Sequence, residues 1–129
     1  MATTPPQTPM VYGIPNCDTV KKARAWLDQN GIAYTFHDFK KQGVPMDLLP
    51  GWLATHGLDV VINRRGPTWR KLDAAVQASV VDAASAIRVI AANSSVVKRP
   101  VVVWPVAAGR PQGCTTVGFD AAKWQQLVA

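Results

Sequence analysis

The chain has 129 residues, of which 48% are hydrophobic and 17% charged, and its formal net charge is +6. This length and composition are typical of a single globular domain and exclude an intrinsically disordered chain. Two cysteines are too few for a disulfide scaffold, and no apolar run is long enough for a transmembrane helix, so we expect a cytoplasmic protein with no membrane partner.

The first third of the chain predicts a strand, a helix and a second strand. Residues 1–9 are rich in proline and lack an apolar stretch, so we expect a flexible leader. Residues 11–14 form the first predicted strand. Residues 18–29 have a helical period, and Asn30-Gly31 is a helix stop signal. The alternation of residues 33–39 predicts a second strand, parallel to the first because a helix connects them.

The remaining chain predicts a block of helices followed by two strands and a helix. Residues 46–56, 74–83 and 84–92 are helical in composition, with a loop at 63–68. The last elements are an apolar β-branched run at 96–104, a turn-rich stretch at 107–113, a strand at 115–117 and a helix at 121–128 that Asp120 can cap. The order β-α-β, helices, β-β-α places the chain in the α/β class.

The basic residues do not follow the pattern of a nucleic-acid-binding protein. The 14 lysines and arginines are dispersed, and no aromatic residues are interleaved with them as base-stacking surfaces require. The positive charge also suits a pocket for anions. Nucleic acid is therefore not the partner we expect.

Cys17 lies where the first predicted strand ends and the helix begins. The free amide groups and the positive dipole end of a helix favour an anion, and a cysteine there can have a pKa of about 3.5–7.5 instead of about 8.5. The thiolate is the nucleophilic form of cysteine. Free cysteines are also among the most buried residues, so position alone leaves a reactive thiolate and a buried side chain as alternatives.

Two sharper motifs are absent around Cys17. Arg24 follows it after six residues, whereas a tyrosine-phosphatase loop has five, and Val20 stands where a thioredoxin dithiol has its second cysteine. A working Cys17 would therefore need Cys114 or an external thiol such as glutathione to resolve it. No metal is expected, because no closed zinc pattern matches the spacing of Cys17, His37, His56 and Cys114.

Five stretches together resemble the arsenate reductase-like (ArsC) family, most closely its YffB branch, with the regulator Spx also related. They are YGIPNCDTVKKARAWL, FHDFKKQG, INRRGPTWRKL, VVKRPVVVW and VGF, and the similarity covers nearly all of residues 10–129. The resemblance implies a thioredoxin-like fold with a helical insertion. We expect a single domain at 10–129 with the insertion at about 44–95, which agrees with the order of elements above.

The resemblance also implies roles for individual residues. In arsenate reductases of this family a cysteine at the first helix is the nucleophile and three arginines hold the oxyanion. The matching positions are Cys17 as nucleophile, Arg64 (or its neighbour Arg65), Arg99 and Arg110 as anion-binding arginines, and Pro100 as the proline that is usually cis in this fold. Asn16 is expected either to hydrogen-bond the thiolate or, more simply, to cap the helix.

The implied activity is that of a thiol-based oxidoreductase. Asp18 follows Cys17 where arsenate reductases have a glycine, and its charge opposes an arsenate dianion. We therefore expect a glutathione-dependent thiol reductase that acts on a small anionic or disulfide substrate, with glutathione as co-substrate, glutaredoxin as a further partner and no bound cofactor. The alternatives are an arsenate reductase proper and a non-catalytic, Spx-like protein-binding module, although Spx has a Cys-x-x-Cys switch that Val20 removes.

Overall fold

The computed structural model of the protein describes residues 8–105 and 114–128, and the chain forms two compact units. The first unit, here called the sheet unit, comprises Met1–Asp38 and Arg99–Ala129, and the second, the helical unit, comprises Phe39–Lys98. The predicted turn at 107–113 and most of the predicted leader at 1–9 lie outside the described residues.

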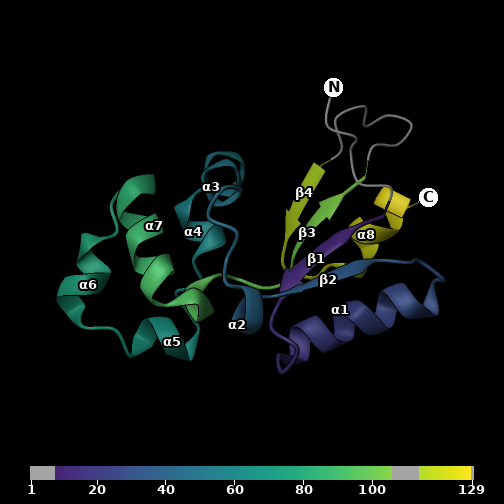
Figure 1. The fold of residues 1–129 in the computed structure, drawn as a ribbon, viewed down its shortest axis with the longest axis horizontal. Coiled ribbons are helices and arrows are strands. Elements are labelled where there is room, and N and C mark those ends of the chain that lie inside the picture. The colour runs from purple at the N-terminus through teal and green to yellow at the C-terminus, as the bar shows by residue number, and fades with distance from the viewer. Residues whose placement is uncertain (1–7, 106–113, 129) are drawn as a thin grey trace. The chain divides into compact units, whose positions relative to one another are not determined.

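The sheet unit is built on a four-stranded mixed sheet (Figure 1). Its strands are β1 (Met10–Gly13), β2 (Thr35–Asp38), β3 (Val101–Trp104) and β4 (Cys114–Val117), in the order β2-β1-β3-β4. β1 is parallel to β2 and antiparallel to β3, and β3 is antiparallel to β4. A β-α-β half and a β-β-α half that share one sheet in this order form the expected thioredoxin-like fold.

Helices α1 (Asp18–Gln29) and α8 (Ala121–Val128) have the bounds that their sequence patterns predict. The predicted stop after α1 is confirmed, since Asn30 is its C-cap and Gly31 has a φ of +66°, where glycine is favoured. The Asp120 carboxylate accepts a hydrogen bond from the Lys123 amide (3.1 Å), which confirms the predicted cap of α8.

One apolar cluster joins both helices to the sheet. It consists of buried residues from α1, α8, β1 and β3: Val11, Ala23, Leu27, Val102, Trp104 and Trp124. The Trp124 ring meets those of Trp104 and Phe119 edge-on, with centroid distances of 5.1 and 4.8 Å. The Trp104 indole donates a hydrogen bond to the buried Thr116 hydroxyl (3.0 Å). A buried indole therefore has the polar partner that it needs.

The helical unit contains six α-helices and one short 3-10 helix among the described residues. They are α2 (Phe39–Gln42), α3 (Leu49–His56), α4 (Leu58–Val61), α5 (Pro67–Arg70), α6 (Ala74–Ser79), α7 (Ala83–Ala92) and η1 (Ser94–Val96). The start of α7 is fixed by a capping box, in which the Ser85 amide donates to the Asp82 carboxylate at 2.9 Å. No helix in the described part of the chain is both long and apolar enough to span a bilayer.

Several predicted bounds need correction. The helices predicted at 46–56 and 74–83 span only Leu49–His56 and Ala74–Ser79. The strand predicted at 96–104 begins only at Val101, because Val96 ends a 3-10 helix and Val97 pairs with Ile62 inside the helical unit. The second strand, predicted at 33–39, begins only at Thr35 and ends at Asp38, since α2 begins at Phe39. The loop predicted at 63–68 is interrupted by α5, whose first residue is Pro67, a favoured residue at that position.

Candidate active site at the start of α1

The turn between β1 and α1 places Cys17 at the amino end of the helix. Cys17 is the N-cap residue, with an extended backbone (φ −116°, ψ 126°), and its carbonyl accepts the first helical hydrogen bond from the Lys21 amide (2.9 Å). Val20, three residues later, is fully buried and anchors this turn of the helix in the core. The Cys17 side chain is half-buried and lies beside amide groups that have no partner within the helix.

The surroundings of the Cys17 sulfur favour its ionised form. Burial, the largest single effect, raises the pKa of the thiol, because it disfavours a charged sulfur. Hydrogen bonding from the Val20 amide, hydrogen bonding and charge from Arg99, and hydrogen bonding from the Thr19 amide act in the opposite direction. Together they lower the pKa of Cys17 below that of an ordinary free cysteine. The Cys17 side chain makes no regular N-cap hydrogen bond in the structure. We therefore infer that the Val20 and Thr19 amides and Arg99 stabilise mainly the ionised sulfur.

Arg99 comes to Cys17 from the opposite half of the sheet unit. It is half-buried and lies two residues before β3, and the Arg99-Pro100 peptide bond is cis, as expected. The Pro100 carbonyl accepts a hydrogen bond from the Gly118 amide (2.8 Å), which ties this segment to the end of β4. The structure therefore brings together two residues, Cys17 and Arg99, that are far apart in the sequence.

Asn16 does not have the capping role that we expected. The helical backbone begins at Asp18, which makes Cys17 the N-cap residue, and Asn16 is exposed one position earlier. A role of Asn16 in substrate binding stays a prediction.

Arg64 belongs to the helical unit. Its guanidinium forms an ion pair with the Asp59 carboxylate (3.0 Å) and lies 5.3 Å from the centroid of the Trp69 ring. The two charged side chains are 44% and 86% exposed, so this pair contributes little stability and is easily displaced by another anion. Neighbouring Arg65 is also exposed. Anion binding by Arg64 stays a prediction, and Arg110 lies outside the described residues.

Cys114 lies at the opposite end of the sheet from Cys17. Cys114 pairs with Trp104 at the end of β3, whereas Cys17 follows the end of β1, where Tyr12 pairs with Val101. Val101 and Trp104, the two β3 residues in these pairs, are three positions apart, which corresponds to about 10 Å along a strand. Neither cysteine forms a disulfide, and this separation is too large for one without a rearrangement of the sheet. The sheet geometry favours an external thiol over Cys114 as the resolving group.

Gly13, the last residue of β1, allows the first turn of α1 to approach the sheet. A Cβ atom at this position would lie 2.9 Å from Cγ2 of the fully buried Val20. We expect Gly13→Ala to destabilise the protein by about 1–3 kcal/mol, and to slow thiolate reactions of Cys17, because it displaces the turn that carries the Val20 amide. Urea unfolding and the rate of thiol alkylation measure the two effects.

Gly51 provides the matched control for this substitution. It lies inside α3, and a Cβ there would meet no atom within 4 Å. Gly51→Ala should therefore leave the alkylation rate unchanged and keep or raise the stability, since alanine favours helix. Equal effects of the two variants would contradict the role given to the close approach at Gly13.

Comparisons with known proteins agree with this geometry. A model of the ArsC family matches residues 12–127. A solved structure of a YffB protein is 44% identical, with a TM-score of 0.82, over 95% of this chain and 100% of that chain. An arsenate reductase-related protein from Brucella melitensis is 43% identical, with a TM-score of 0.67, over 95% of each chain. The global transcriptional regulator Spx of Streptococcus mutans is 26% identical over 91 residues, which are 69% of this chain and 65% of that protein. The chain therefore belongs to the ArsC family and has its arsenate reductase-like thiol oxidoreductase fold.

Proposed function

We propose that this protein is a glutathione-dependent thiol reductase in which Cys17 is the only nucleophile. The observation that carries the proposal is the setting of the Cys17 sulfur, where two backbone amides and the Arg99 guanidinium favour the thiolate. A thiolate held in this way attacks sulfur far more readily than a neutral thiol. The ArsC-family fold supports the same class of chemistry.

The proposed reaction consists of two thiol–disulfide exchanges. The Cys17 thiolate attacks the glutathione sulfur of a mixed disulfide, the S–S bond breaks, and the substrate leaves as a thiolate. A second glutathione, as thiolate, then attacks the glutathione sulfur bound to Cys17. That step releases oxidised glutathione and restores the Cys17 thiolate. Of the two glutathione units in this product, one comes from the mixed-disulfide substrate and the other from free glutathione. An external thiol is needed because Cys114 lies at the far end of the sheet.

Arg99 has two proposed roles in this cycle. Its guanidinium stabilises the resting thiolate, and its planar fork suits one carboxylate of the bound glutathione. When Cys17 is joined to glutathione its sulfur is neutral and no longer attracts the Arg99 guanidinium. The guanidinium can then bind the glutathione carboxylate.

Arsenate is the second candidate substrate, since an anion-binding arginine lies beside the thiol and a similar structure is of an arsenate reductase-related protein. Asp18 argues against it. This carboxylate is exposed in the first turn of α1, next to the nucleophile, where it repels a dianion more strongly than a disulfide. A Cys-x-x-Cys redox switch like that of Spx is also disfavoured, because the buried Val20 occupies the position of the second cysteine.

We expect Arg99→Gln to move the pH profile of Cys17 upward. The substitution removes both the charge and the charged hydrogen bond at the sulfur, so the pKa of Cys17 rises and less thiolate is present at pH 7. Hydrogen bonds to charged groups are worth roughly 1.5–3 kcal/mol, and we expect a loss of about tenfold in exchange rate at pH 7. Rates of alkylation and of glutathione exchange measured against pH give both values.

Lys98→Gln is the control for Arg99→Gln, because it removes the same charge from an exposed side chain one residue away. It should leave the pH profile in place. If Arg99→Gln also leaves it in place, Arg99 does not act on the thiol.

Mass spectrometry tests the proposed activity directly. A Cys114→Ser variant is mixed with a glutathionylated peptide, and the reaction is stopped in acid. The proposal predicts one glutathionyl group on Cys17, the free peptide thiol, and removal of that group by added glutathione. If Cys17 is ionised yet takes up no glutathione, the reductase proposal fails, and reduction of arsenate under the same conditions would replace it.

A further inference from the structure

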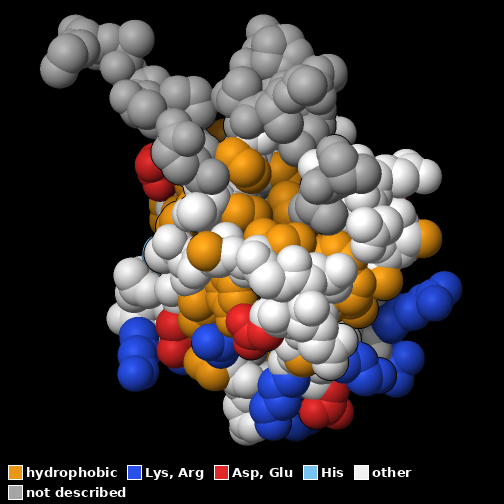
Figure 2. Space-filling view, turned by 90° about the vertical axis from the view of Figure 1, so that its right-hand side faces the viewer, with side chains coloured by type: hydrophobic (Ala, Val, Ile, Leu, Met, Phe, Trp, Pro, Cys, Tyr) orange, Lys and Arg blue, Asp and Glu red, His pale blue; other side chains and the backbone are white. Residues whose placement is uncertain are grey.

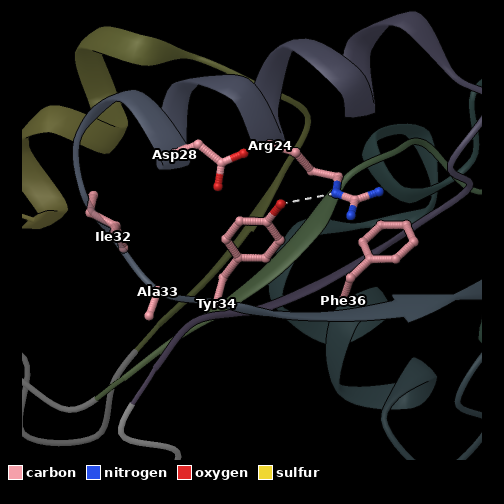
Figure 3. A pocket seen from close by; sticks show the side chains of 6 residues that line it. All are labelled: Arg24, Asp28, Ile32, Ala33, Tyr34 and Phe36. Atoms are coloured by element: carbon pink, nitrogen blue, oxygen red, sulfur yellow. Dashed lines mark hydrogen bonds between the residues drawn. The ribbon is translucent and has the colours of Figure 1, made fainter.

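The sheet unit has a second charged site, centred on Arg24 in the middle of α1 (Figure 3). Two adjoining pockets of about 360 and 270 Å³ share Arg24, Asp28 and Tyr34 as lining residues. Phe36 of β2 adds an aromatic wall to the first pocket, and Lys21 adds a positive charge to the second. None of these residues takes part in the chemistry proposed for Cys17.

The Arg24 guanidinium is held in a fixed orientation. Its Nε donates a hydrogen bond to the Tyr34 hydroxyl (3.0 Å), and its Cζ lies 4.2 Å from the centroid of the Phe36 ring. Figure 3 shows the guanidinium between that hydroxyl and that ring. These two contacts leave the terminal amino groups of the fork available, and the Tyr34 hydroxyl keeps its own hydrogen for donation. The site can therefore offer several donors to one anion.

No carboxylate neutralises Arg24 in the described part of the chain. Asp28 lies one helical turn further along α1 and lines the same pockets, yet no ion pair joins the two side chains. Ion pairs at this spacing on a helix are common, so the contacts with Tyr34 and Phe36 hold the guanidinium in place of the acid. An oriented arginine without a counter-ion is suited to bind an external carboxylate.

The backbone beside this pocket can also accept a partner. β2 is an edge strand of the sheet, and the Thr35 amide donates to the Pro9 carbonyl on the β1 side (3.0 Å). Because alternate residues of a strand direct their main-chain groups to opposite sides, those of Tyr34 and Phe36 point away from β1, along the outer edge. The side chains of these two residues share the face of the sheet that carries Arg24.

We propose that the β2 edge and the Arg24 pocket together bind an extended peptide segment of a partner protein that carries one acidic side chain. The peptide pairs with the main chain of Tyr34 and Phe36, and its carboxylate lies on the Arg24 guanidinium. Lys21 attracts the acid to one end of the site, whereas Asp28 repels a second acid at the other end. The segment that fits best is therefore singly acidic where it crosses α1.

The test uses acetyl-Thr-Val-Glu-Val-Thr-amide and the same peptide with glutamine in place of glutamate. Each is titrated into the full-length, isotope-labelled protein while its amide and arginine side-chain NMR signals are followed. We expect the acidic peptide to shift the amide signals of Tyr34 and Phe36 and the Nε signal of Arg24. The glutamine peptide should bind at least about fivefold more weakly, because it lacks the charged hydrogen bonds.

Variants on α1 make the test specific to Arg24. Arg24→Gln should weaken binding of the acidic peptide to the level of the glutamine peptide, and Arg24→Lys, which keeps the charge but loses the fork, should give an intermediate affinity. Lys22→Gln removes the same charge from an exposed residue that lines neither pocket, and it should bind like the unmodified protein. The dispersion of the NMR signals shows whether each variant is folded.

Two outcomes would overturn the proposal. One is equal binding of the acidic and glutamine peptides, or no shift at Tyr34 and Phe36. The other is that free glutarate shifts the Arg24 signal at the same concentrations as the peptide, which would make the pocket a site for small anions instead. Arg24→Gln should leave the glutathione exchange of Cys17 unchanged, so this proposal and the proposed function can fail separately.

Discussion

Replacing Cys17 with serine is expected to abolish thiol–disulfide exchange while the fold stays intact. Serine keeps the size of the side chain, but its hydroxyl is a weak nucleophile at neutral pH without an adjacent base. Loss of a catalytic nucleophile costs several orders of magnitude in rate, and we expect at least about a thousandfold. The measurement is the steady-state rate of glutathione release from a glutathionylated peptide in the presence of excess glutathione.

Cys114→Ser is the matched control, because it makes the same chemical change at the other half-buried cysteine. It should retain most of the rate, since Cys114 lies at the far end of the sheet from Cys17. A loss of similar size in both variants would mean that the two cysteines act together, and the single-nucleophile scheme would then be wrong.

Trp124→Ala is expected to cause the largest loss of stability of any substitution considered for the sheet unit. Trp124 is fully buried, and its ring contacts those of Trp26, Trp104 and Phe119 at centroid distances of 4.8 to 5.8 Å. Truncation of a buried tryptophan to alanine typically costs about 3–5 kcal/mol, which is a large fraction of the stability of a small domain. Urea unfolding monitored by circular dichroism measures the change.

The control for Trp124→Ala is the neighbouring Lys123→Ala on the exposed side of α8. A surface substitution of this kind should change the free energy of unfolding by no more than about 0.5 kcal/mol. If Trp124→Ala has an equally small effect, α8 does not pack on the sheet through the aromatic cluster described here.

The elements with strong local signals were predictable from the sequence. The bounds of α1 follow from an apolar period that starts after Cys17 and ends at Asn30-Gly31, and those of α8 follow from the Asp120 cap. The parallel pairing of β1 with β2 follows from the single helix that connects them. In each case the signal lies within a few residues of the element that it specifies.

The elements that depend on tertiary structure were not predictable in the same way. Buried valines lie on both sides of the segment Lys98-Arg99-Pro100, so composition alone does not show that Val97 pairs with Ile62 in the helical unit and that β3 begins only at Val101. The four-residue helices α4 and α5 are too short for a helical period to be visible.

The candidate site likewise contains one part that local sequence predicts and one part that depends on the tertiary structure. The position of Cys17 at a helix start was readable from local sequence, whereas its pairing with Arg99 came from the family resemblance and needs the fold to be seen. The Arg24 site was missed, because its parts come from α1, from β2 and from Tyr34, the residue before β2. Arg24, Tyr34 and Phe36 were each assigned to an element, but no local pattern indicates that they meet. Figure 2 shows hydrophobic side chains gathered on the face of the molecule that lies on the right in Figure 1.

The most direct test of the account is the pKa of Cys17, measured from thiolate absorbance against pH in the Cys114→Ser variant. The account predicts a pKa below that of an ordinary free cysteine, because the Val20 and Thr19 amides and Arg99 stabilise the thiolate more than burial disfavours it. The same titration of Arg99→Gln should give a higher pKa. A Cys17 pKa at or above that of an ordinary free cysteine would contradict the central claim that this site is built to ionise the thiol.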